Sequence, residues 1–386
     1  MIYLDNDATT PVDARARDAM LPFLEADCGN PASREHAFGW KAAEAVDEAR
    51  GNLAALINSR PDEILFTSGA TESINAALKG LLFSQPVQRI LTSAAEHQAV
   101  LECCQWMESH FKMNVACLPV DRAGKIELSA LESALRQAHP SCICLMLANN
   151  EIGNIHPVRQ VAEFAHAAGA LFFSDITQAA GKIPVDVRAM GIDLAAFSAH
   201  KLYGPKGVGA LFIRSGEPRI ELEPLIVGGG QERGLRAGTL NVPGIVGFGE
   251  ACRIAKLEMA EESKRVGRLR DKLENSLLAE IPDIWINGDR QNRLPNTTNI
   301  GFRGVDARTL IRDMHDIAVS TKSACSSGQP GPSHVLKAIG LTDDEAYSCI
   351  RFSLGRFTTE QEIDYAIAKV VASVRKLRAS TSSSTA

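Results

Sequence analysis

The sequence DITQ at positions 175–178 and the sequence SAHKLYGPKG at positions 198–207 decide how this chain is interpreted. Each follows a short apolar run, so each begins where a buried strand is expected to end. Pyridoxal phosphate needs two groups in such places: a lysine as its Schiff-base partner, and a carboxylate that keeps its ring nitrogen protonated. The two stretches therefore predict a pyridoxal-phosphate site, with Lys201 and Asp175 in these roles.

These residues also have ordinary structural interpretations. Lys201 could be a surface lysine in a Gly/Pro turn, and Asp175 could cap a helix that follows its strand. The histidine next to the lysine, His200, and the strand-end position of Asp175 favour the cofactor site. Gln178 is then placed to donate a hydrogen bond to the phenolate oxygen of the cofactor ring.

Short apolar segments alternate with helical patterns on both sides of this region. Strands are expected at 64–66, 89–93, 143–147, 170–174, 194–197 and 209–213. Amphipathic helices are expected among them, for example at 38–58, 73–82 and 161–168. This alternation predicts an α/β fold whose main sheet is largely parallel and buried on both faces.

The later part of the chain has a different character. A long charged amphipathic helix is expected at 253–280, followed by more alternating sequence and a Gly/Pro/Ser loop. We therefore expect a large cofactor-binding domain over 13–255 and a smaller α+β domain made of 1–12 and 256–378. Residues 379–386 are rich in Ser and Thr and are expected to form a disordered tail.

Composition excludes several classes of function. The net charge is −5, and no basic block is present, which argues against direct binding of nucleic acid. No apolar run approaches the length of a membrane span, and the start of the chain lacks a secretory pattern, so we expect a cytoplasmic protein without membrane contact. The nine cysteines include no C-x-x-C pair, so neither a disulfide framework nor a metal site is expected.

A phosphate-binding turn is expected near the start of the chain. The sequence SGAT at 68–71 follows an expected strand and opens an expected helix, the arrangement that binds anions, and Ser198 and His200 could add donors. A second glycine-rich stretch at 228–239 lies too far along the chain to share that turn. Its spacing alone assigns it no function.

Three more residues suit a site that converts an amino acid. His97 follows the strand at 89–93 and could stack on the ring and move protons, although a lone histidine is more often a satisfied polar residue. Cys325 lies in a loop of small residues near Lys322, which favours an exposed thiolate and makes it the candidate nucleophile. Arg351 suits the carboxylate of an amino acid, and a structural ion pair is equally compatible with its sequence context.

Taken together, these motifs resemble the NifS/IscS-type cysteine desulfurases, which are pyridoxal-phosphate enzymes of the class V aminotransferase group. The resemblance covers nearly the whole chain and is carried by LDNDATTP (4–11), GNPAS (29–33), TSGATE (67–72), NNEIG (149–153), RAGT (236–239) and RFSLGR (351–356). It implies the fold type I of pyridoxal-phosphate-dependent transferases.

The resemblance also implies site residues. The cofactor would be bound by Ala70, Thr71, His97, Asn150, Asp175, Gln178, Ser198, His200, Lys201 and Thr239. Thr239 would reach the phosphate of the neighbouring subunit, which implies a homodimer. Arg351 and Asn150 would bind the substrate, and Cys325, Lys201 and His97 would be the catalytic residues.

The implied reaction converts L-cysteine to L-alanine. Lys201 would move the Cα proton, and the Cys325 thiolate would take the sulfur as a persulfide and pass it to an acceptor protein. That acceptor would serve iron–sulfur cluster assembly or thio-modification of nucleic acid. A selenocysteine lyase or another class V aminotransferase is the alternative, and a non-catalytic interaction protein is disfavoured by the intact site residues. Lys322 departs from the family, which usually has glycine at this position. Pro330-Gly331 and Ile176 also differ from the residues that are usual in the family.

Overall fold

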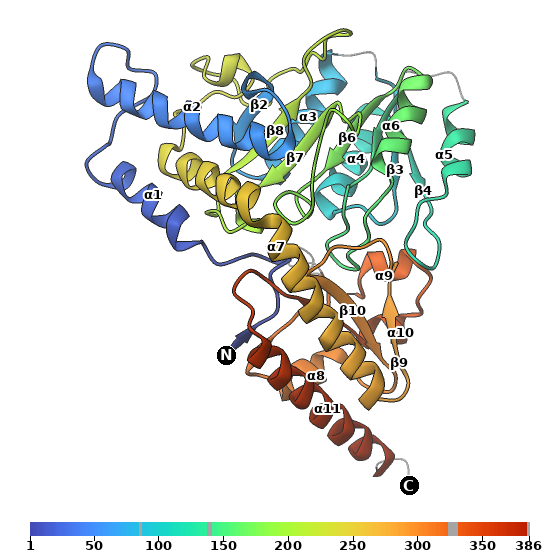
Figure 1. Ribbon diagram of the computed structural model, residues 1–386. Coiled ribbons are helices and arrows are strands. Elements are labelled where there is room, and N and C mark those ends of the chain that lie inside the picture. The colour runs from blue at the N-terminus through green and yellow to red at the C-terminus, as the bar shows by residue number, and fades with distance from the viewer. Residues whose placement is uncertain (85–86, 137–140, 323–330, 384–386) are drawn as a thin grey trace.

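A seven-stranded sheet forms the centre of the larger part of the molecule (Figure 1). The structure is a computed structural model, and it describes residues 1–84, 87–136, 141–322 and 331–383. The strand order is β2-β8-β7-β6-β5-β3-β4. The bounds are Ile64–Thr67 (β2), Arg89–Ser93 (β3), Asn114–Leu118 (β4), Ser141–Cys144 (β5), Leu171–Asp175 (β6), Leu194–Ser198 (β7) and Gly209–Ile213 (β8).

The sheet is mainly parallel, as the sequence predicted. Strands β4, β3, β5, β6 and β7 pair in parallel, whereas β8 is antiparallel to both of its neighbours. The two consecutive residues Phe172 and Phe173 are fully buried in different hydrophobic cores, one on each face of the sheet. A strand covered on both faces can therefore be apolar throughout, which explains the unbroken apolar runs in the sequence.

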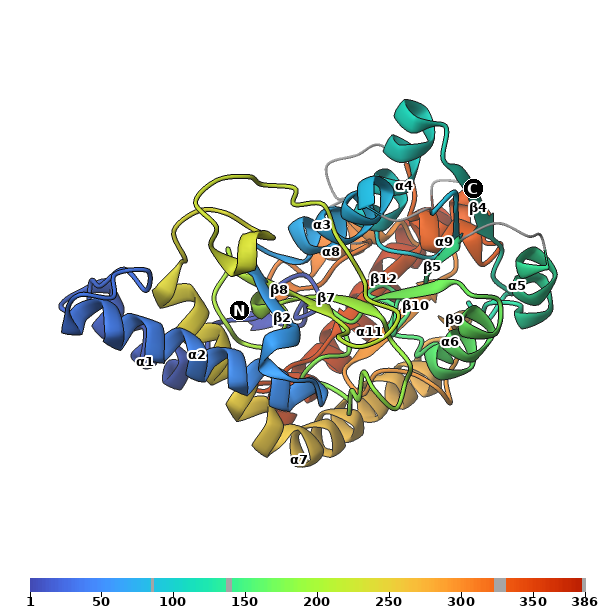
Figure 2. The ribbon, with the colours of Figure 1, turned by 90° about the horizontal axis from the view of Figure 1, so that it is seen from above.

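Helices cover both faces of this sheet (Figures 1 and 2). One core joins the sheet to α3 (Ala70–Ser84) and α4 (Gln98–Phe111). The other joins it to α2 (Ala37–Ile57), α5 (Leu128–Leu135), α6 (Val158–Ala167) and the first half of α7 (Val242–Glu280). The helix α1 (Ala14–Leu24) packs against α7, and short 3-10 helices lie at Pro61–Glu63, Ala199–Lys201 and Glu232–Gly234.

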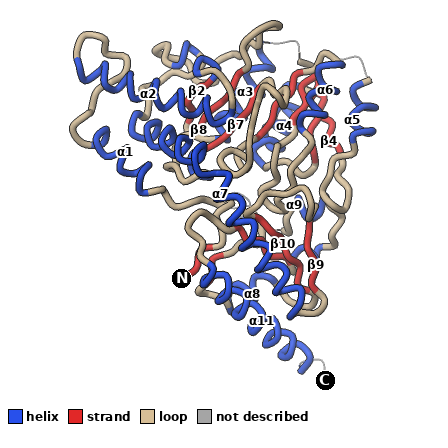
Figure 3. The backbone as a smooth tube through the Cα atoms, viewed as in Figure 1, coloured by secondary structure: helices blue, strands red, loops and turns tan. Residues whose placement is uncertain are grey.

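The smaller part of the molecule lies at the far end of α7 (Figure 3). It contains a three-stranded antiparallel sheet, in the order β12-β10-β9, and a short parallel pair of β1 and β11. Its strands are β1 (Ile2–Tyr3), β9 (Ile284–Asn287), β10 (Thr297–Phe302), β11 (Ile317–Ala318) and β12 (Cys349–Ser353). Its helices are α8 (Ala307–Asp313), α9 (His334–Ala338), α10 (Asp343–Tyr347) and α11 (Glu360–Ser383).

The helix α7 links the two parts without interruption. Its residue Ala255 belongs to the core of the large sheet, and Val266 belongs to the core of the smaller part. The domain boundary predicted at residue 256 lies inside this helix, so the predicted division of the chain stays a prediction. Among the described residues, no helix combines the length and hydrophobicity that crossing a membrane requires.

Two helices extend further than the sequence indicated. α7 begins at Val242, not at residue 253, because glycines that look unfavourable for a helix allow close packing: a Cβ on Gly249 would lie 2.5 Å from Ala49 of α2. α11 continues to Ser383, although we expected disorder from Ala379. Within this last part of the helix, the hydroxyl of Ser380 donates to the carbonyl of Leu377 at 2.8 Å.

Candidate active site

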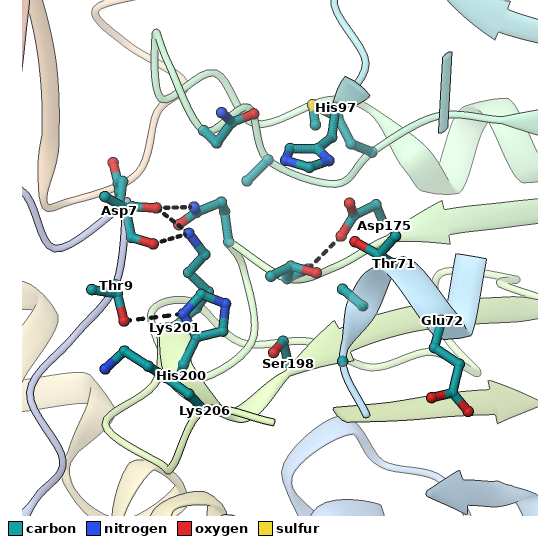
Figure 4. A pocket seen from close by; sticks show the side chains of 18 of the residues that line it. Asp7, Thr9, Thr71, Glu72, His97, Asp175, Ser198, His200, Lys201 and Lys206 are labelled. Carbon is teal, nitrogen blue, oxygen red and sulfur yellow. Dashed lines mark hydrogen bonds between the residues drawn. The ribbon is translucent and has the colours of Figure 1, made fainter. Parts of the chain in front are cut away.

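A cavity of about 380 Å³ lies at the carboxyl edge of the central sheet (Figure 4). Segments that follow β2, β3, β5, β6 and β7 form its walls, together with the N-terminal segment and β12. Ligands of open α/β sheets bind at this edge. The cavity brings together ten of the predicted residues: Ala70, Thr71, His97, Asn150, Asp175, Gln178, Ser198, His200, Lys201 and Arg351.

Lys201 ends the short 3-10 helix that follows β7, and its amine is held by the N-terminal segment. Its Nζ atom donates to the carbonyl oxygen of Ala8 at 2.6 Å and also to that of Asp7. The turn after it is tight, because a Cβ on Gly204 would lie 2.8 Å from the Cβ of Ala199. Gly204 and Pro205 therefore close the turn that directs Lys201 into the cavity.

Asp175 is the last residue of β6 and is only 5% exposed. Its Oδ1 atom accepts the backbone N–H of Thr177 at 2.9 Å. Because β6 and β7 are parallel neighbours, their carboxyl ends lie at the same edge of the sheet, and Asp175 faces the same cavity as Lys201. The structure thus brings together the carboxylate and the amine that the sequence predicted.

One corner of the cavity has the features of an anion site. It combines the N-terminus of α3 at Ala70, the hydroxyl of Ser198, and the ring of His200, whose Nδ1 atom lies 3.1 Å from the hydroxyl of Thr9. Burial and the nearby lysine ammonium groups together lower the pKa of His200 to about 4, so its ring is neutral at physiological pH. Helix N–H groups and positive charge together favour a phosphate at this corner.

His97 caps α4, with its Nδ1 atom accepting the N–H of Ala99 at 3.1 Å. Figure 4 shows its ring across the cavity from Ser198 and His200. With Nδ1 as the acceptor, the proton of the neutral ring is on Nε2. The capping bond therefore fixes both the position of the ring and its tautomer.

Arg351 lies in the middle of β12 and is 1% exposed. Its guanidinium donates to the carbonyl oxygen of Asn150 at 2.7 Å and forms an ion pair with Asp5, also at 2.7 Å. Its Nε atom is buried and has no hydrogen-bond partner in the described structure. The ion pair that the sequence left as an alternative is therefore present.

Cys325 lies outside the described residues, but both flanks of its segment are described. On one side, the Lys322 ammonium donates to the carbonyl of Gly331 at 3.4 Å. On the other, Ser333 donates to the carboxylate of Glu151 at 2.5 Å, and His334 donates from Nε2 to the carbonyl of Glu96 at 2.8 Å. The part of the chain that follows this segment therefore lies beside the loops that carry Asn150 and His97.

Thr239 is exposed and does not line the cavity of its own chain. In the same segment, Arg236 pairs with Glu72 in the first turn of α3, at 2.9 Å. The predicted contact of Thr239 with a neighbouring subunit stays a prediction. Sequence reasoning missed other residues that line the cavity, among them Asp7, Thr9, Glu72 and Lys206.

The described geometry agrees with comparisons to known proteins. Residues 2–366 match the model of the class V aminotransferase family, so the chain belongs to this family. A cysteine desulfurase IscS from Serratia proteamaculans is 48% identical over 381 residues, which are 98% of this chain and 93% of the relative. Within the family, the chain thus belongs to the IscS/NifS-type cysteine desulfurases.

Solved structures show the same relationship. A NifS-like protein superposes with a TM-score of 0.88 at 39% identity, and the match covers 96% of this chain and 98% of that one. A structure of SspA in complex with cysteine superposes with a TM-score of 0.81 at 34% identity, covering 93% of this chain and 100% of that one. These findings confirm the resemblance, the fold class and the enzyme class predicted from the sequence, and the family implies pyridoxal phosphate as cofactor.

Proposed function

We propose that this chain binds pyridoxal phosphate and L-cysteine in the described cavity and transfers the substrate sulfur to Cys325. The observation that carries the proposal is the meeting of Lys201, Asp175 and an anion-binding corner in one cavity. Its volume of about 380 Å³ lies within the usual range of small-molecule sites, about 300–1,000 Å³.

The residues present fit the cofactor. The corner formed by the α3 N-terminus, Ser198 and His200 would hold the phosphate, and Asp175 would hold the proton of the ring nitrogen. Gln178 would donate to the ring oxygen, with Asn150 nearby, and His97 would stack on the ring. When bound, pyridoxal phosphate supplies an electron sink that stabilises negative charge on the substrate Cα.

The substrate would be oriented by Arg351. Arg351 lines the cavity, and its planar guanidinium suits the carboxylate of an amino acid. With that carboxylate fixed at β12, the Cα–H bond can face Lys201 from across the cavity. The Lys201 amine would leave the carbonyls of the N-terminal segment in order to remove and return the Cα proton.

Cys325 would complete the reaction as a nucleophile. Its thiolate attacks the substrate sulfur, so that a bond between the two sulfur atoms forms while the bond between Cβ and sulfur breaks. The carbon skeleton takes up protons and leaves as alanine, and the sulfur stays on the enzyme as a persulfide. Contacts at one end of the segment support this role, because Ser333 and His334 bind Glu151 and Glu96, the neighbours of Asn150 and His97. Lys322 joins the other end of the segment to Gly331.

A second copy of this chain and a sulfur acceptor complete the proposal. Thr239 would reach the phosphate of a neighbouring subunit, and the exposed side chains of Leu225, Ile226 and Val227 in the preceding segment are suited to such an interface. We expect a cytoplasmic homodimer that passes its persulfide to an acceptor protein of iron–sulfur cluster assembly or of nucleic-acid thio-modification.

The role of Cys325 is tested by alanine formation from L-cysteine. Cys325→Ala is expected to stop turnover while leaving the visible absorption of the bound cofactor intact. Cys28→Ala is the control, because Cys28 is an exposed cysteine that does not line the cavity. Unchanged turnover in Cys325→Ala would favour another class V activity, such as a transaminase that needs no thiol.

A further inference from the structure

A buried ion pair lies directly behind the predicted ring-binding glutamine. The Nζ atom of Lys182 lies 2.8 Å from Oδ1 of Asp7, and the side chains are 10% and 0% exposed. Asp7 also accepts from the hydroxyl of Thr297 at 2.6 Å and the amide of Asn296 at 2.9 Å. Burial raises the pKa of Asp7, but the charges of Lys182 and Arg351 and these hydrogen bonds lower it to about 2. The carboxylate is therefore ionised and fixed from several sides.

The pair determines how the side chain of Gln178 is oriented. The Oε1 atom of Gln178 accepts from the Lys182 ammonium, and its Nε2 atom donates to the carbonyl oxygen of Asp7 at 3.0 Å. An ammonium can only donate and a carbonyl can only accept, so these two partners permit one orientation of the amide. Rotating the amide by half a turn would place its N–H groups against the ammonium and its oxygen against a carbonyl.

This orientation matters because Gln178 lines the cavity and Lys182 does not. The Nε2 atom carries two hydrogens, and the bond to Asp7 uses one of them. The second is left for an acceptor in the cavity, such as an anionic ring oxygen. The same carbonyl of Asp7 also accepts from Lys201, so one residue of the N-terminal segment sets the positions of both cofactor-facing side chains (Figure 4).

We propose that Asp7 and Lys182 are positioning residues that hold the amide of Gln178 with its nitrogen, not its oxygen, facing the ring oxygen of the cofactor. The proposal rests on the proposed function, because it assumes that the cofactor binds in this cavity. Neither charged group touches the cofactor in this account. Lys182 acts through Gln178, and the Asp7 carboxylate acts through Lys182.

The test uses the double variant Asp7→Asn/Lys182→Met in the cofactor-loaded protein. Both charges are removed, so the net charge near Lys201 is unchanged, while the amide of Gln178 loses the ammonium that binds its oxygen and keeps only the main-chain carbonyl of residue 7 as a partner. The readout is the pH midpoint at which the visible absorption of the bound cofactor changes. A hydrogen bond to the ring oxygen favours the more anionic form, so its loss should raise the midpoint by about half to one pH unit.

A comparison with Gln178→Ala shows whether the pair acts through the amide. In the wild-type background, Gln178→Ala should raise the midpoint by a similar amount. Added to the double variant, it should add little, because the amide is already released. The double variant Glu274→Gln/Arg293→Met is the matched control: this pair is similarly buried, at 1% and 5% exposure, and lies outside the cavity, so its midpoint should stay at the wild-type value.

The outcomes separate the two proposals. A full effect of Gln178→Ala together with a wild-type midpoint in Asp7→Asn/Lys182→Met would overturn the positioning role alone. No effect of Gln178→Ala would overturn the contact between this amide and the ring oxygen, and with it the positioning role, whereas no visible absorption in the wild-type protein would overturn the cofactor site itself. If the double variant does not fold, Lys182→Met is compared in the wild-type and Gln178→Ala backgrounds: a smaller shift of the midpoint in the Gln178→Ala background is expected, and an equal shift in both backgrounds would overturn the positioning role.

Discussion

The two walls of the cavity differ in how completely their polar groups are paired. On the ring-side wall (Asp7, Gln178 and Lys201, with Lys182 behind them), each charged or amide group has at least one protein partner. On the substrate-side wall (Asn150 and Arg351, with Asp5 behind them), the guanidinium keeps a buried Nε donor with no partner in the described structure. A buried unpaired donor is costly, so the substrate-side wall carries a cost that the ring-side wall does not. On the ring-side wall, one hydrogen of the Gln178 amide is left for the proposed cofactor, and on the other wall the Arg351 guanidinium would bind the proposed substrate.

The largest expected effect falls on the ring-side wall. Lys201→Ala removes the amine that moves the Cα proton, and alanine formation from L-cysteine should fall by at least about a thousandfold. Lys79→Ala is the control, because that lysine lies outside the cavity, over the ring of Trp106. Turnover within tenfold of wild type in Lys201→Ala would show that another group moves the proton.

The next effect falls on the substrate-side wall. Arg351→Lys keeps the charge but loses the planar fork, and kcat/KM for L-cysteine should fall by about a hundredfold. Cysteamine, which lacks the carboxylate, should lose little by comparison. An equal loss for both substrates would mean that Arg351 only supports the fold, and the contrast between the walls would not hold.

A stability measurement probes the ring-side wall without cofactor. The folded pKa of Asp7, about 2, is below its unfolded value of 3.8, so ionised Asp7 stabilises the fold above pH 3.8, and this contribution is lost as the pH falls towards 2. Asp7→Asn should therefore lower the free energy of unfolding at pH 7 by about 2 kcal/mol. Urea unfolding of the cofactor-free proteins at pH 7 and pH 3 should show this difference narrowing in acid; a constant difference would contradict the ion-pair explanation.

The smallest effect concerns Asp5, which shares the guanidinium with the proposed substrate. Asp5→Asn keeps a hydrogen-bond acceptor but removes a negative charge that repels the substrate carboxylate. We expect KM for L-cysteine to fall by about threefold, with kcat unchanged, as is usual for weakening one charge contact near solvent. Steady-state kinetics check this, and a rise in KM would show that the Asp5 charge mainly orients Arg351.

The part of the site that the sequence predicted depends on local features. Lys201 and Asp175 each follow an apolar strand, and parallel strands bring such ends to one edge of a sheet. Asp7 and Lys182 could not be paired in this way, because they are 175 positions apart and meet only through the tertiary fold. The pairing of Asp5 with Arg351, which are 346 positions apart, could not be predicted for the same reason.

The fold, like the site, was predicted where local sequence features are sufficient. Alternating apolar and helical segments were enough for the mainly parallel sheet and its covering helices. The first turns of α7 were missed because local propensity counts against glycine, whereas Gly249 is needed where α7 approaches Ala49 of α2. The end of α11 was missed because a Ser/Thr-rich composition indicates disorder and does not show that a packed helix precedes it.

The central claim is that Lys201 is the residue that bonds to the cofactor. Borohydride reduction of the protein loaded with pyridoxal phosphate, followed by peptide mapping, tests this directly. The account predicts one pyridoxyl group per chain, on the peptide that contains Lys201, and none on Lys182 or Lys206. A label on either of those lysines, or no label at all, would contradict it.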